Sequence, residues 1–128
     1  MQDNYPDKNL VSSEEQEEFN ELTSSLITLS QQATSLTELK KIFDESEEFE
    51  VDDIVIWKDG LKNKTYPSYE QVAIVLEVLS EPLYNQSVEP DSPYYNEPLD
   101  ILLGFKDQEG DMLTFYYDKR RFKKLKED

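Results

Sequence analysis

Two short apolar runs rich in β-branched residues constrain the fold of this chain more than any other part of its sequence. The first run is Asp53–Lys58 and the second is Gln71–Leu79. β-Branched and aromatic side chains fit the pleated surface of a sheet, and short apolar runs bounded by turn residues are typical of strands. We therefore expect two strands joined by the polar loop 59–70, which has turn signals at both ends.

Three further strand patterns follow in the second half of the chain. They cover residues 99–105, 112–117 and 122–125. A long proline-bearing loop at 80–98 precedes the first of them, and loops of this length are functional or partly disordered. Residues 106–111 predict a hairpin connection, with Gly110 placed for a left-handed residue. Residues 118–121 predict one tight turn.

The N-terminal part of the chain carries helical patterns instead. Ser12 and Glu15 are spaced as in a capping box, and an apolar stripe follows them, which predicts a helix from about 13 to 31. The stripe consists of Phe19, Leu22, Leu26 and Leu29. Ser35 and Glu38 repeat the capping pattern and predict a second helix that ends near 44–48, where acids oppose the helix dipole.

These elements predict an α+β fold. We expect an N-terminal helical hairpin packed on a five-stranded antiparallel SH3-like small β-barrel. The expected division is a flexible arm at 1–11, the hairpin at 12–48 and the barrel at 49–128, with hairpin and barrel in one compact unit. Two short apolar stripes make a poor core alone, so the helices should pack on the sheet or on a partner.

One family shares this layout. The similar features are the strand Gln71–Leu79, the acidic insert Glu81–Pro98 with its Ser92–Tyr95 segment, and two strands before a short charged tail. In spacing, residues 49–125 resemble the hemimethylated-DNA-binding SH3-like barrels. The resemblance implies a small barrel. The chain departs from the family in its two extra helices and its negative charge, so no DNA-binding residues are carried over.

The net charge is strongly negative. The 128 residues include 29 acidic and 13 basic ones, for a net charge of −16 at pH 7. This field repels nucleic acid and anionic membranes and attracts basic partners. The acidity either keeps the protein soluble, or it meets a basic protein site, such as one that normally holds DNA or RNA.

Several kinds of chemistry are excluded or disfavoured by composition. The chain has no cysteine and no histidine, which excludes disulfides, zinc clusters and Ser-His or Cys-His nucleophile pairs. Its three glycines stand apart, so there is no phosphate-binding loop. The acids at 107–111 resemble a calcium loop, but strand patterns flank them and a hairpin turn fits better. We expect no enzyme activity, no cofactor and no metal.

The first residues lack the features of a signal peptide, and no apolar run is long enough to span a membrane. We therefore expect a cytoplasmic protein with no membrane partner.

Three groups of side chains are candidates for binding a partner. Loop tyrosines could line a groove for peptides or cationic side chains, or could simply cover the barrel ends: Tyr66, Tyr69, Tyr84, Tyr94 and Tyr95. The first helix carries an acidic group: Glu14, Glu17, Glu18 and Glu21. The third group is basic and could contact phosphate or this chain's own acids: Lys119, Arg120 and Arg121.

The leading hypothesis is a non-catalytic, acidic protein-interaction protein, adaptor or regulator, that binds a basic protein partner. A second hypothesis is a nucleic-acid mimic whose carboxylates replace phosphates and block a DNA-binding protein. A third is weak nucleic-acid binding through the basic C-terminal segment, although direct binding is disfavoured by the net charge. The partner and the oligomeric state stay open.

Overall fold

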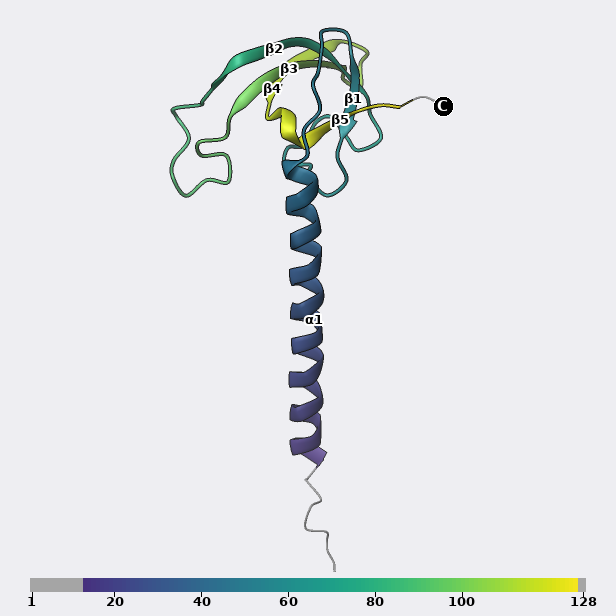
Figure 1. Ribbon diagram of the computed structural model, residues 1–128, viewed down its shortest axis with the longest axis vertical. Helices are drawn as coiled ribbons and strands as arrows, with labels where there is room; N and C mark the ends of the chain where they lie inside the picture. Colours follow the sequence, from purple (N-terminus) through teal and green to yellow (C-terminus); the bar gives the residue numbers. More distant parts are fainter. Residues whose placement is uncertain (1–12, 127–128) are drawn as a thin grey trace, which may run out of the picture. The chain divides into compact units, whose positions relative to one another are not determined.

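A computed structural model of the chain describes residues 13–126, with side chains from residue 15 onward. The predicted arm 1–11 and the capping residue Ser12 lie outside this range. The elements, in chain order, are helix α1 (Ser13–Asp44), strands β1 (Ile54–Trp57), β2 (Ala73–Leu83), β3 (Leu99–Lys106) and β4 (Met112–Tyr117), the 3-10 turn η1 (Lys119–Arg121) and strand β5 (Phe122–Lys124) (Figure 1).

The N-terminal helix is one continuous element, so the predicted helical hairpin is wrong. No break occurs between residues 31 and 35, where the second capping pattern predicted one. Two threonines beside the predicted break donate hydrogen bonds within the helix: Thr34 Oγ1 to the carbonyl of Ser30 and Thr37 Oγ1 to that of Ala33. Bonding to the i−4 carbonyl lets such residues stay inside a helix. The predicted end near Asp44 is confirmed.

The chain divides into two compact units within α1. The helix unit ends at Glu38 and the sheet unit begins at Leu39. The last turn of α1 therefore belongs with the strands, while the described part of the helix unit is the rest of α1.

The apolar stripe of α1 is exposed in the described structure. Its large side chains are each more than half exposed: Phe19, Leu22, Leu26, Leu29 and Leu36. Ile27, off the stripe, is also exposed.

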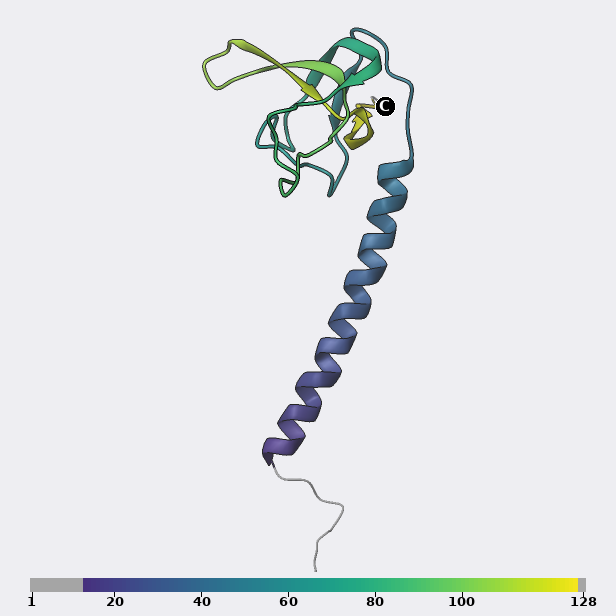
Figure 2. The ribbon, with the colours of Figure 1, turned by 90° about the vertical axis from the view of Figure 1, so that its left-hand side faces the viewer.

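The sheet unit contains a five-stranded sheet in the order β4-β3-β2-β1-β5, antiparallel throughout. This confirms the α+β class. The sheet is not closed: among the described residues β4 and β5 are its edges, so a closed barrel is not observed. β2 runs four residues past its predicted end at Leu79, and register shifts within it, between Val75 and Glu77 and between Val78 and Leu83, accompany its curvature (Figures 1 and 2).

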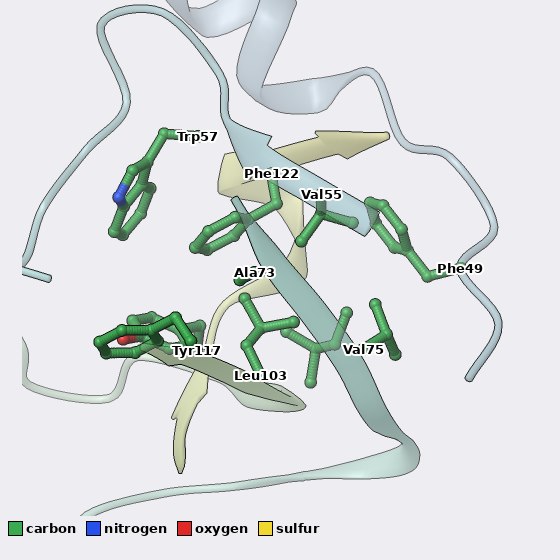
Figure 3. Packing of buried hydrophobic residues seen from close by; sticks show 10 residues of the cluster. Phe49, Val55, Trp57, Ala73, Val75, Leu103, Tyr117 and Phe122 are labelled. Atoms are coloured by element: carbon green, nitrogen blue, oxygen red, sulfur yellow. The ribbon is translucent and has the colours of Figure 1, made fainter. Parts of the chain in front are cut away.

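The core lies on the concave side of these strands and is rich in aromatic residues (Figure 3). Trp57 stacks on Phe122 with ring centroids 4.2 Å apart and meets Tyr117 edge-on at 5.7 Å. Its indole Nε1 donates to the carbonyl of Pro67 at 2.6 Å. Trp57 is thus a core residue, and it fixes the first long loop to the sheet.

The last turn of α1 is held inside the sheet unit by a buried lysine. The Lys58 ammonium donates to the carbonyls of Ile42 at 2.7 Å and Glu45 at 2.5 Å. These carbonyls lie at the end of the helix, where backbone acceptors lack intrahelical donors and the dipole favours a cation. Burial lowers the pKa of Lys58, and the negative charges of Glu45 and Glu47 partly oppose that shift.

Candidate partner-binding site

The hairpin between β3 and β4 gathers three carboxylates. Asp107 Oδ1 accepts hydrogen bonds from the backbone N–H groups of Glu109 and Asp111, both at 2.9 Å, and Gly110 takes a positive φ of 90°. The carboxylate oxygens of Asp107, Glu109 and Asp111 lie within 4.8 Å of one another. Among the described residues this is the one such group that could hold a cation. Three close negative charges favour a positively charged ligand.

An aromatic wall lies beside the hairpin. Tyr66, from the first long loop, stacks on Phe105 of β3 with centroids 6.5 Å apart, and Phe105 stacks in turn on Phe115 at 6.0 Å. Phe105 is buried, whereas Tyr66 is 53% exposed. The loop is tied to the strand because Gln71 Nε2 donates to the carbonyl of Lys106. This hydrogen bond anchors to β3 the end of the loop that carries Tyr66.

Tyr66, Phe105, Asp107 and Glu109 take part in lining a cavity of about 440 Å³, which we call the aromatic–acidic pocket. Its lining residues are Tyr66, Ser68, Gln71, Phe105, Lys106, Asp107, Gln108, Glu109 and Leu113. An aromatic face attracts a cation, and carboxylates beside it supply the matching charge. Two carboxylates outnumber the one ammonium in the lining. This chemistry suits the end of an arginine or lysine side chain.

An apolar groove adjoins the pocket on the sheet. It measures about 630 Å³ and shares Gln71, Phe105 and Lys106 with the pocket lining. Its apolar lining residues include Ile54, Val72, Ile74 and Met112, of which Val72 and Met112 are 46% and 58% exposed. Apolar surface beside a few polar groups is typical of binding sites.

Neither Tyr94 nor Tyr95 lines this pocket. The ring of Tyr94 instead lies under a lysine of the same chain. Lys64 Nζ lies 5.1 Å from the Tyr94 ring centroid and 2.6 Å from a carboxylate oxygen of Glu97. The Tyr94 hydroxyl donates to the carbonyl of Asn63 at 2.9 Å. These contacts join the two long loops. Tyr95 keeps half of its surface exposed.

The two remaining predicted tyrosines are Tyr69 and Tyr84. Tyr69 lies under Lys62, whose Nζ is 5.9 Å from the ring centroid, and Tyr84 is exposed at the end of β2. Neither lines the aromatic–acidic pocket. Of the five predicted tyrosines, Tyr66 alone lies in it.

The predicted basic group is largely engaged within the sheet unit. Arg120 makes a two-pronged contact with the buried carboxylate of Asp118, at 3.0 and 2.8 Å, which raises the pKa of Arg120. Its guanidinium carbon also lies 4.3 Å from the ring centroid of Phe43, and that of Arg121 lies 5.0 Å from it. The Lys119 backbone N–H donates to Asp100 at 2.8 Å. These arginines brace the end of α1 instead of forming an open phosphate site.

The predicted acidic group lies on the helix unit, and the side chain of Glu14 is outside the described residues. Glu17, Glu18 and Glu21 are exposed. After Glu21 no charged residue occurs until Glu38. A continuous row of carboxylates along the helix, as nucleic-acid mimicry requires, is therefore interrupted over half of its length.

Sequence reasoning missed the acids of the pocket. Residues 107–111 were correctly predicted as a hairpin, but Asp107 and Glu109 were not proposed as partner-binding residues. A usable signal was present: an acidic hairpin joins two strands that carry Phe105 and Phe115. The contribution of Tyr66 from a distant loop could not be read from that signal.

Comparison of the chain with protein-family models, with curated proteins and with solved structures finds no match. Within the described residues, no helix has the length and apolar character needed to cross a membrane.

Proposed function

We propose that this chain is a non-catalytic protein-interaction module that binds a basic segment of a partner protein. The observation that carries the proposal is the aromatic–acidic pocket, where the exposed ring of Tyr66 stands beside the carboxylates of Asp107 and Glu109. The negative net charge adds long-range attraction for a basic partner. The adjoining apolar groove offers a place for an uncharged side chain next to the bound arginine or lysine.

The non-catalytic part of the proposal has support from the titratable groups. Burial raises the pKa of Asp100 and of Tyr117 and lowers that of Lys58. Each of them is tied to backbone groups, and none lines the aromatic–acidic pocket. Active sites typically combine a cleft with perturbed groups facing it.

An SH3-like small-barrel layout, with the sheet left open between β4 and β5, belongs to the same proposal. Support comes from the five-strand order, the long first loop, the tight β3–β4 hairpin and the 3-10 turn before β5. The resemblance to the hemimethylated-DNA-binding barrels concerns this layout. DNA binding is not carried over, because Arg120 and Arg121 are engaged with Asp118, Phe43 and Leu61.

A peptide titration tests the proposal. The probe is a fluorescent hexa-arginine peptide, with hexaglutamate as the negative control, and anisotropy is the readout. Tyr66→Ala should weaken binding about 3- to 10-fold, as expected for the loss of one cation–π contact. Glu109→Gln should weaken it by a similar factor, and less so at high salt.

Matched controls separate this pocket from general charge attraction. Tyr95→Ala removes an equally exposed tyrosine, and Glu89→Gln removes one exposed carboxylate of the second long loop. Both should leave the affinity within about 2-fold of the original. Equal losses in pocket and control variants would refute the pocket as the binding site.

A further inference from the structure

The continuous helix extends the apolar stripe of the helix unit beyond what two separate helices would allow. Its members are Phe19, Leu22, Leu26, Leu29, Ala33 and Leu36. Their spacing alternates between three and four residues. This is the heptad pattern in which the a and d positions face a second helix. The five large side chains in it are exposed.

The composition of the same segment favours a packing partner. Residues 22–37 contain four serines, four threonines and no charged residue. Serine and threonine each disfavour an isolated helix by about 0.5 kcal/mol relative to alanine, and helical stability in proteins comes mostly from packing. The hydroxyls of Thr23 and Thr37 donate to backbone carbonyls within the helix, so they require no water. The segment is suited to burial against another helix.

We propose that the helix units of two copies of this chain form an antiparallel two-stranded coiled coil. In the register that we propose, residues whose numbers add up to 55 lie opposite each other. Phe19 faces Leu36 of the second copy, Leu22 faces Ala33, and Leu26 faces Leu29. Every a position then meets a d position, and the two-fold axis passes between residues 27 and 28. A contact made once is made twice, as a symmetric dimer requires.

The flanking positions explain how two copies of so acidic a chain can associate. The e and g positions beside the core are uncharged between residues 22 and 37, so no carboxylates are brought together there. Glu17, Glu18 and Glu21 precede this uncharged segment. The antiparallel register keeps these acids of the two copies at opposite ends of the coiled coil, whereas a parallel register would bring them together. The charge pattern therefore favours the antiparallel direction.

The stripe ends where the sheet unit begins. Leu39, at the next flanking position, lies against Gly60, so close that an added Cβ there would be 2.5 Å from Leu39 Cδ2. Residues 19–36 span about two and a half heptads, fewer than the three or four of a long coiled coil. We therefore expect a weak dimer, with a dissociation constant on the order of 10 µM.

Sedimentation equilibrium of the full chain tests the association. The mass should rise from 15.1 kDa toward twice that value as the concentration passes through the micromolar range. The double variant Leu26→Glu with Leu29→Glu should stay monomeric at concentrations 10-fold higher. The matched control, Ser24→Glu with Gln31→Glu, adds the same charge on the opposite helix face and should still dimerise.

Two further readouts make the test decisive. Trp57, the one tryptophan, reports whether the sheet unit of each variant is folded. A spin label on Glu17→Cys, the only cysteine then present, should show a distance of about 30 Å, since the register sets the two labels about 21 residues apart along the helices. A monomer at every concentration, a trimer or larger species, equal loss in the control, or a label distance well below 20 Å would each overturn the proposal.

Discussion

Replacement of Lys58 by methionine tests how the end of α1 is held in the sheet unit. Methionine keeps an unbranched apolar stem but removes the ammonium, so the carbonyls of Ile42 and Glu45 both lose their donor. Hydrogen bonds from a charged donor contribute about 1.5–3 kcal/mol each. Two effects reduce the sum. Burial disfavours the ammonium, as its lowered pKa shows, and a hollow of about 310 Å³ lined by these residues admits water to the freed carbonyls.

We therefore expect Lys58→Met to lower the free energy of unfolding of the sheet unit by about 2 kcal/mol. The assay is urea unfolding followed by the fluorescence of Trp57, which is 1% exposed and stacked in the core. Lys40→Met is the matched control, because Lys40 lies in the helical turn that contains Ile42. Its side chain is 77% exposed, and in the described contacts it pairs only with Asp44. A surface pair of this kind contributes less than about 0.5 kcal/mol.

A loss below about 0.5 kcal/mol for Lys58→Met, or equal losses for the two variants, would refute the reasoning that the buried ammonium anchors the helix end.

Three other perturbations probe the sheet unit. Gly60→Ala should cost roughly 1–3 kcal/mol in urea unfolding, because φ is +84° and the new Cβ would meet Leu39; an unchanged midpoint would contradict this contact. Arg120→Ala should cost about 2–3 kcal/mol, since it leaves the carboxylate of Asp118 buried without its cation, and a neutral outcome would mean that water replaces the arginine. Burial raises the pKa of Asp100, so the folded state binds more protons above pH 3.8, and stability falls as pH rises through that shifted pKa. Asp100→Asn should therefore raise the melting temperature at neutral pH, with the advantage disappearing below about pH 4; an advantage independent of pH would exclude titration as its cause.

Local patterns determined most of the secondary structure. The strand at 112–117 and the hairpin before it follow from alternating apolar residues around Gly110, and both depend on neighbours in sequence. The end of α1 near Asp44 follows from acids that the helix dipole disfavours there. The continuity of α1 was missed because Ser35 and Glu38 satisfy a capping pattern equally well inside a helix. Local signals alone do not separate those two outcomes.

The sequence by itself determined which segments form strands and a helix. It also determined the strong negative charge and the lack of histidine and cysteine. Only the tertiary structure decided which aromatic rings stay open to a ligand. It brought Tyr66 beside Asp107 and Glu109, and it placed Lys64 on Tyr94, although each pair is widely separated in the chain. Pairings of this kind depend on where the two long loops fold back on the sheet, and local propensities do not encode the path of a loop.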